Sequence, residues 1–373
     1  MTLRRTLRSE SGYSLVELLI STAIMLVVTG AIFGLVNPSQ GTAKVQPEVA
    51  DLQQRLRVSS DTLFQELMMA GAGVYQVPVT GSLINFFAPI IPRRMGRTGA
   101  DQVTDARSDT ITLSYIPNTY SQTTISSPMP NVSAELKVTD QANCPDGVNL
   151  CGFTDGMDAI IFDTSGNFDI FTITEVQDAA AHLQHRNNDL SIAYSVGATV
   201  TQIQSHTYYW CRPGTERPCP DATASQLRRY DGNTEDVALV DNVVEVKFEY
   251  FGDPNPPLKP KPTAGVANCL YDAAGNYLNL PTLTADDGSL ANLPLEILKD
   301  GPFCGGGANQ FDADLYRVRK VRVTLRVQVG DSSLRGTDEA LWVNPGKSRG
   351  SATVVRDLAV SFEVTPRNMN LSR

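Results

Sequence analysis

One apolar stretch near the start of the chain limits what the protein can fold into. Residues 12–36 read GYSLVELLISTAIMLVVTGAIFGLV and contain a single charged side chain, Glu17. At a rise of about 1.5 Å per residue, a helix from Tyr13 to Val36 would be roughly 36 Å long, enough to cross a hydrocarbon core of about 30 Å. The stretch therefore predicts a membrane-spanning helix.

The charges before this helix predict its orientation. They are three arginines and one acid, namely Arg4, Arg5, Arg8 and Glu10. Excess positive charge should hold the short leader in the cytoplasm, so that the rest of the chain crosses the membrane. A cleavable secretory signal would have a shorter apolar core, of about 7–15 residues, followed by a small-residue cleavage site. This core is longer and no such site closes it, so we expect the helix to be kept.

Glu17 is the unusual residue of the stretch. An ionisable side chain inside an apolar span is costly and points to a function. Because Glu17 stands near the start of the span, it could equally lie at the membrane interface at little cost. The residues alone leave both interpretations open.

The segment SGYSLVELL resembles the class III signal of type IV pilins and related pseudopilins. In that family a prepilin peptidase cleaves after the glycine, here Gly12, on the cytoplasmic side. It then N-methylates the new first residue, here Tyr13, where phenylalanine is commoner. The apolar helix is kept and packs into the core of a filament. The resemblance therefore implies a removed leader at 1–12 and a transmembrane or filament-core helix at 13–36.

The resemblance also implies an assembly role for Glu17. Cleavage after Gly12 would turn the Tyr13 amine into a cation about one helical turn from the Glu17 carboxylate. A buried charge is tolerated when it is paired. In the family, this glutamate pairs with the N-terminal amine of a neighbouring subunit during assembly.

The composition bounds the rest of the chain. With 373 residues, 42% of them hydrophobic and 19% charged, it can bury a sizeable core in one large or two ordinary domains. The net charge of −9 argues against a general nucleic-acid surface. No CxxC occurs, and the three histidines (His182, His185 and His206) share no motif with a Ser or Cys nucleophile. We therefore expect no catalytic residues, no cofactor and no metal site.

The six cysteines indicate an oxidising compartment, since they lie in the part of the chain expected to be translocated. They fall in three neighbouring pairs: Cys144 with Cys151, Cys211 with Cys219, and Cys269 with Cys304. Pairing of neighbours is the simplest of many connectivities and would staple three loops. Reduced thiols are the alternative.

A second helix is predicted after the apolar stretch. Asn37-Pro38-Ser39 should break the first helix, because proline disfavours helix at the residue before it and removes a donor. From about Gln46 to Ala70 apolar residues recur at helical spacing, which predicts an amphipathic helix whose apolar stripe packs on a sheet. Gly71 and Gly73 should end it. The stripe consists of Val49, Leu52, Leu56, Leu63 and Leu67. By the resemblance, 37–72 form the second half of the pilin helix.

From about Ser108 onward the sequence predicts strands. Residues there are rich in β-branched and aromatic types with period-two alternation, which indicates sheets with one buried and one wet face. Thr164-Ser165-Gly166-Asn167 is typical of a hairpin turn. The predicted strands lie within 109–116, 157–176, 191–195, 199–210, 226–232, 242–251, 320–329 and 353–365.

The segment from Gly252 to Gln310 differs in composition, with five prolines near its start and Gly305-Gly306-Gly307 near its end. It predicts an insertion or long loop on the sheet, held by a Cys269–Cys304 bridge if these residues pair. Such loops often bind ligands, but a solvated insertion without a ligand is the commoner case.

Two polar groups of residues suggest binding and have simpler interpretations. The first alternates like the start of a calcium loop, but its glycine and its twelfth position do not fit, so we interpret it as a polar hairpin. The second is basic and could contact a phosphate backbone, but pairing across strands with Glu245 and Glu249 accounts for it better. The first group is Asp163, Ser165, Asn167 and Asp169, and the second is Arg317, Arg319, Lys320, Arg322 and Arg326.

The order of the later segments resembles PilW-type minor pilins, and the J-type minor pseudopilin of type II secretion is similar in plan. The resemblance implies an α+β fold, with a long N-terminal helix packed on a periplasmic, globular antiparallel β domain at 73–373. It implies a non-enzymatic minor pilin of the bacterial inner membrane, cleaved by prepilin peptidase, that joins other minor and major pilins through its helix. Such a subunit primes filament assembly and could reach the pilus tip. A secretion pseudopilin, or a tip adhesin or DNA-uptake subunit that uses 252–310, stays open.

Overall fold

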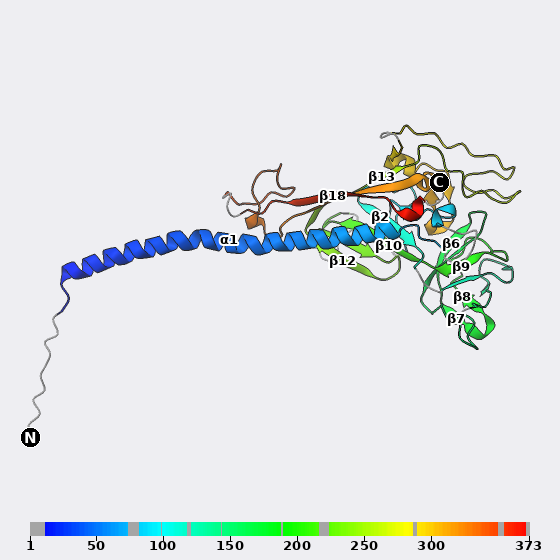
Figure 1. Cartoon of the computed structure of the whole chain (residues 1–373), viewed down its shortest axis with the longest axis horizontal. Helices are drawn as coiled ribbons and strands as arrows, with labels where there is room; N and C mark the ends of the chain where they lie inside the picture. The colour runs from blue at the N-terminus through cyan, green and yellow to red at the C-terminus, as the bar shows by residue number, and fades with distance from the viewer. Residues whose placement is uncertain are drawn as a thin grey trace, which may run out of the picture. The chain divides into compact units, whose positions relative to one another are not determined.

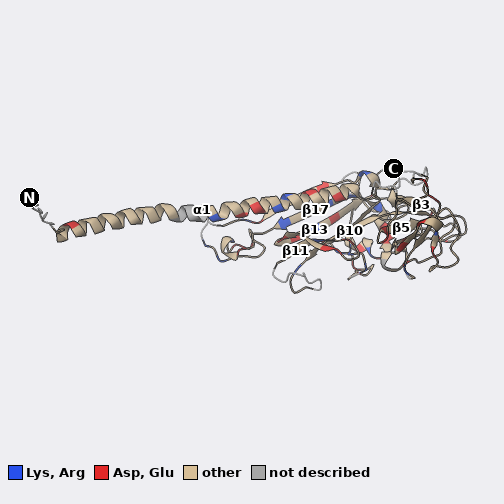
Figure 2. Cartoon of the chain, turned by 90° about the horizontal axis from the view of Figure 1, so that it is seen from below, with Lys and Arg blue, Asp and Glu red and all other residues tan. Residues whose placement is uncertain are grey.

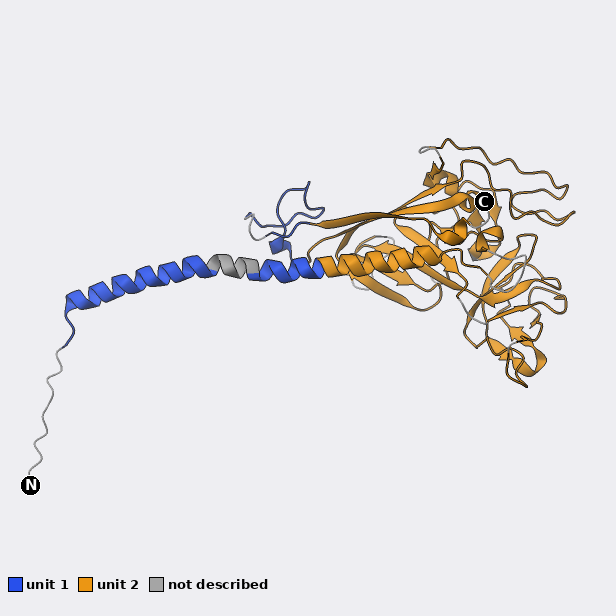
Figure 3. Ribbon diagram, viewed as in Figure 1, with its two compact units in different colours: residues 1–52, 331–356 blue, residues 53–330, 357–373 orange. Residues whose placement is uncertain are grey.

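A computed structural model describes most of the chain. The described residues are 12–73, 82–97, 99–117, 121–142, 144–187, 189–215, 224–285, 289–349 and 354–370, without the side chains at 37–42 and 308. A long N-terminal helix is followed by antiparallel sheets (Figure 1), which confirms the expected α+β fold. The chain divides into two compact units, one formed by 1–52 with 331–356 and the other by 53–330 with 357–373 (Figure 3).

Helix α1 runs without interruption from Leu15 to Met69. The predicted break at Asn37-Pro38-Ser39 is therefore wrong. Proline fixes φ near −65°, which fits a helix, so its main effect inside one is a lost hydrogen bond and a clash that together cost about 3 kcal/mol. A helix with long segments on both sides can tolerate that cost. The predicted end is right, because Gly71 takes the left-handed conformation (φ 76°) and its N–H donates to the Ser114 carbonyl at 3.1 Å.

The second half of α1 is amphipathic, as predicted. Leu63 and Leu67 from the predicted stripe are fully buried, and so is Ala70. Phe64 contacts the neighbouring sheet at its edge, with its ring centroid 6.4 Å from that of Phe362. The residues of α1 beyond Leu52 are thus fixed to the larger unit by apolar packing.

Two antiparallel sheets form the body of the larger unit. The first has the order β1-β2-β10-β11-β12, from β1 (Ile90–Ile91), β2 (Thr110–Tyr115), β10 (Gln204–Cys211), β11 (Gln226–Tyr230) and β12 (Asp236–Asp241). The second has the order β14-β13-β17-β18, from β14 (Ala291–Leu293), β13 (Val243–Gly252), β17 (Val318–Val327) and β18 (Leu358–Val364). Along β17, buried valines and Leu325 alternate with half-exposed polar residues, as the sequence predicts.

The part of the chain that follows β2 and precedes β10 in the sequence forms a smaller β region with its own apolar core. Its sheets have the orders β3-β9-β5-β6 and β4-β8-β7. Their strands are β3 (Gln122–Thr124), β4 (Leu136–Lys137), β5 (Asp158–Phe162), β6 (Phe168–Thr172), β7 (Glu175–Gln177), β8 (His182–Gln184) and β9 (Thr199–Gln202). Two further short strands, β15 (Phe303–Cys304) and β16 (Phe311–Asp312), pair with each other. The 3-10 helices are η1 (Leu83–Asn85), η2 (Asp178–Ala180), η3 (Leu295–Leu298), η4 (Gly307–Asn309), η5 (Ala313–Arg317), η6 (Ser332–Leu334) and η8 (Arg367–Met369).

The strand predicted at 191–195 is wrong. Ser191 and Tyr194 instead turn their polar groups to one buried carboxylate, that of Asp169. Its Oδ2 accepts from the Ser191 N–H at 2.8 Å, the Ser191 hydroxyl at 3.0 Å and the Tyr194 hydroxyl at 2.9 Å. Bonds to this side chain take the place of a strand ladder.

The predicted hairpin joins β5 to β6. Asp163 Oδ1 accepts from the N–H groups of Ser165 at 2.8 Å and Asn167 at 3.1 Å. Gly166 has φ 86°, and a Cβ there would stand 2.4 Å from Pro260 Cγ, so glycine is required. Because Asp163 is engaged by the turn and Asp169 by the segment at 191–194, the alternating polar residues form a hairpin and not a calcium loop.

The basic group of β17 is paired with acids, and one of the two partners expected from the sequence, Glu249, is among them. Arg322 lies 2.5 Å from Glu363 and 4.0 Å from Glu249. The other partners are new: Lys320 pairs with Glu363, Arg326 with Asp357 and Arg319 with Asp253. Glu245 stands opposite Arg326 in the ladder, but the Arg326 guanidinium lies 3.0 Å from the Asp357 carboxylate.

Arg317 departs from that interpretation, because it is fully buried in η5. Its Nε lies 2.5 Å from Asp314 Oδ1. Its other nitrogens donate to the carbonyls of Pro254 at 3.1 Å and Pro281 at 2.6 Å. A buried guanidinium needs such partners, so Arg317 holds the Gly252–Gln310 insertion against the sheet.

Two buried carboxylates lie at the edge of this insertion. Asp312 accepts from the N–H groups of Gly301 at 2.5 Å and Asp314 at 2.8 Å. Burial raises the pKa of Asp312 to about 7 and that of Asp314 to about 6. Nearby Asp300 adds repulsion to both.

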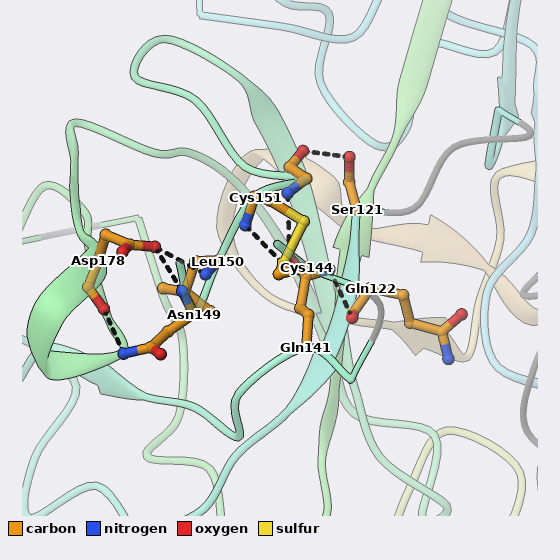
Figure 4. The surroundings of a disulfide bond; sticks show 9 residues. Ser121, Gln122, Gln141, Cys144, Asn149, Leu150, Cys151 and Asp178 are labelled. Atoms are coloured by element: carbon orange, nitrogen blue, oxygen red, sulfur yellow. Dashed lines mark hydrogen bonds between the residues drawn. A yellow bond between two sulfur atoms is a disulfide. The ribbon is translucent and has the colours of Figure 1, made fainter. Parts of the chain in front are cut away.

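Two disulfides lie in the described residues. Cys144 is bonded to Cys151 and Cys269 to Cys304. Figure 4 shows the first of them, in a loop pinned by Asp178, whose Oδ1 accepts from the Asn149 and Leu150 N–H groups. The third expected pair, Cys211 with Cys219, cannot be followed because Cys219 lies outside the described residues.

The two disulfides should differ in how much they stabilise the fold. In the chain-entropy model a bond that closes a longer loop restricts the unfolded chain more. The separations of 7 and 35 residues correspond to about 2 and about 4 kcal/mol respectively. Replacing both Cys269 and Cys304 by Ala should therefore lower the free energy of unfolding more than the same change at Cys144 and Cys151, as measured by urea denaturation. Equal losses in the two double variants would contradict this.

The raised pKa values predict a pH dependence of stability. Between about pH 4 and pH 7 the folded chain keeps protons on Asp312 and Asp314 that the unfolded chain has released, so the free energy of unfolding should fall as pH rises. We expect a contribution of about 4 kcal/mol from Asp312 alone over this window. Asp312→Asn should flatten the curve when urea denaturation is compared at pH 5 and pH 7.5. An unchanged slope would show that Asp312 titrates at its ordinary value.

Candidate functional site

The start of α1 is organised by Ser14 and Glu17. The Ser14 N–H donates to Glu17 Oε2 at 3.1 Å, and the Ser14 hydroxyl accepts from the Val16 N–H at 3.4 Å. The Ser14 carbonyl accepts the first helical bond, from the Leu18 N–H at 3.1 Å. This is a capping box, in which side chains satisfy the free donors of the first turn.

The bond between Gly12 and Tyr13 lies just before this cap. Both residues have non-helical backbone, and the Tyr13 side chain is 90% exposed. The capped helix begins at Leu15, so the bond is accessible and Glu17 is about one turn away. The structure therefore brings together Gly12, Tyr13 and Glu17, the three predicted residues of this site.

The capping role of Ser14 was not predicted. The spacing Ser14-x-x-Glu17 before an apolar run is the signature of a capping box and was visible in the sequence. Glu17 thus has a structural role in the free chain. A negative side chain in the first turn also interacts favourably with the positive end of the helix dipole.

The first half of α1 presents an apolar surface on all sides. Leu15–Val36 has a mean hydropathy of 2.4, is long enough to cross a membrane, and has no buried part. Its hydroxyl groups bond within the helix, since Ser21 and Thr22 both donate to the Leu18 carbonyl at 3.0 Å. Figure 2 shows this half as an uncharged stretch after its first turn, in contrast to the charged second half. Such a surface requires lipid or other apolar helices around it.

One group of side chains in the described residues could hold a metal ion by its geometry. The carboxylates of Asp300, Asp312 and Asp314 offer oxygens within 4.8 Å of one another. Asp312 already accepts two backbone bonds and Asp314 is paired with Arg317, so these oxygens have partners within the protein. This gathering of carboxylates was not predicted, because Asp300 and Asp314 are separated in the sequence by β15 and β16.

Comparison with known families assigns the N-terminal site. The family model described as the prokaryotic N-terminal methylation motif matches residues 7–33. In the corresponding comparisons, no curated protein and no solved structure matches the chain. The matched residues include the Gly12–Tyr13 bond, the capping box and most of the bare apolar helix. The motif implies processing by prepilin peptidase and assembly with other pilins, and together with the apolar helix it supports a membrane-anchored, single-pass protein that is type IV pilin-like or pseudopilin-like.

Proposed function

We propose that the protein is a minor pilin of a type IV pilus that takes part in priming filament assembly and acts without catalysis. The observation that supports this most is the Glu17 carboxylate, which stands at the start of a bare apolar helix directly after a cleavable, exposed bond. A large β domain follows this helix. In a subunit that starts a filament, such a domain would lie at the tip.

The mechanism follows from electrostatics in an apolar medium. Cleavage after Gly12 creates an amine on Tyr13, and Glu17 of an adjacent subunit is the carboxylate that can neutralise it. Two charges attract strongly where water is excluded, whereas a lone charge there is costly. Apolar helices would therefore associate side by side, in an arrangement that places each carboxylate at an amine.

Substitutions of Glu17 should separate its capping role from its charge. Glu17→Gln keeps a side chain that can accept from the Ser14 N–H, whereas Glu17→Ala removes it. We expect both variants to be cleaved after Gly12 and both to reduce surface pili at least tenfold, because both lack the charge. Processing is measured by the mass of the mature chain and assembly by counting sheared pili. If Glu17→Gln supports normal pili, the cap and not the charge is what assembly requires.

Deletion of the gene should distinguish a pilus subunit from a secretion subunit. We expect surface pili to be lost and the secretion of enzymes to continue, both assayed in the same strain. Restoring the intact chain should restore the pili, and restoring Glu17→Ala should not. Intact pili with lost secretion would instead assign the chain to the minor pseudopilins of type II secretion. If neither changes, assembly priming is wrong.

A further inference from the structure

A cavity of about 350 Å³ lies in the larger unit where several separate segments of the chain meet, among them Asp231–Asn233. One wall is the segment Met95–Arg97, and a second is formed by strands β5 and β6 with Asp189–Ser191. The third contains Gly306 and Gly307 of the insertion. The volume is at the lower end of the range of ligand pockets, so it fits one small group and not a large cofactor.

Negative charge predominates in this cavity. Its lining includes four carboxylates and one cation among the described residues: Asp158, Asp169, Asp189, Asp231 and Arg97. Three of the carboxylates have clear partners in the protein. Asp189 lies 3.3 Å from the Arg97 guanidinium, Asp169 accepts from Ser191 and Tyr194, and Asp231 Oδ1 accepts three N–H groups of its own turn.

Asp158 differs from the other three. Its Oδ1 accepts from the Thr172 hydroxyl at 2.5 Å, and the described residues supply its other oxygen with no hydrogen bond. It lines both this cavity and a neighbouring one of about 380 Å³. Burial raises the pKa of Asp158. The Thr172 hydroxyl and the Arg97 charge lower this pKa in part, and Asp231 and Asp189 add to the increase. A positive group near this carboxylate would offset both increases.

No three of these carboxylates offer oxygens within 4.8 Å of one another. Among the described residues, those whose oxygens gather within 4.8 Å lie elsewhere, at Asp300, Asp312 and Asp314. Carboxylates distributed around a cavity of this size suit an organic cation, whose charged group is attached to a carbon skeleton. The lining also supplies apolar surface for such a body, from Phe171, Leu190 and Ile203.

We propose that this cavity binds an organic cation, an alkylammonium or guanidinium group, with Asp158 as its ionic partner and the apolar lining residues in contact with its aliphatic stem. Arg97 then acts as a competitor, because its guanidinium pairs with Asp189 in the same lining. Such a cation could come from a free polyamine or from a Lys or Arg side chain of another protein. This proposal does not depend on the function proposed for the N-terminal helix.

The test uses the full chain in a non-ionic detergent and a fluorescent hexapeptide with one central lysine in a glycine–serine background. We expect saturable binding by fluorescence anisotropy and none for the matched peptide with glutamate. Asp158→Asn should weaken binding at least tenfold and Arg97→Gln should strengthen it. Asp140→Asn is the control, because it changes net charge equally at an exposed position outside the cavity.

Competition distinguishes the two sources of the cation. If spermidine displaces the peptide at a lower concentration than Nα-acetyl-lysine amide does, the cavity is a polyamine site. The reverse order indicates a site for a protein side chain. The proposal is wrong if the lysine peptide does not bind, or if Asp158→Asn and Asp140→Asn bind it alike. It is also wrong if calcium chloride displaces the peptide at constant ionic strength. If Asp158→Asn lowers the melting temperature, its loss of binding is not informative. The proposal then requires that Arg97→Gln bind the lysine peptide more tightly, and it is wrong if binding does not strengthen.

Discussion

The structure depends on one continuous helix whose two halves meet different surroundings. From Leu15 to Val36 no part of α1 is buried by the protein, whereas Leu63 and Leu67 near its end are fully buried. An uncovered apolar helix is unstable in water, so its partners must be lipid or other helices. The second half of α1 cannot cover the first half, because its own apolar side chains are already packed inside the protein. The first half of α1 is thus available to contact lipid or other helices, whereas the second half takes part in folding.

A polar contact fixes the covered half. His206 Nδ1 of β10 lies 3.0 Å from Glu66 Oε2, and the Tyr115 hydroxyl of β2 donates to the other oxygen of Glu66 at 3.4 Å. Burial and Glu66 together raise the pKa of Tyr115 to about 12. These bonds have direction, which apolar packing lacks, so they define how the end of α1 is rotated on the first sheet.

Local sequence patterns predicted the helices and strands of this fold better than the long-range contacts between side chains. The alternation along β17 and the stripe through Leu63 and Leu67 are set by neighbouring residues, and both appear as predicted. Arg317 looked like one more surface cation, because nothing near it in the sequence shows that Pro254 and Pro281 come to its side chain. The N-terminal site was predictable because its residues are adjacent. The cavity was not, since Asp158, Asp189 and Asp231 come from separate segments and share no motif.

The capping box bears on how a proposed filament subunit would change partners. In the free chain the Glu17 carboxylate accepts from the Ser14 N–H, so it is not a bare charge before assembly. A carboxylate has room for further donors, and an amine from an adjacent subunit can approach its other oxygen without breaking the cap. The helix start would therefore stay ordered while the charge gains its partner. Because the cap fixes where the carboxylate points, it would also favour one axial offset between adjacent helices, at which amine and carboxylate meet.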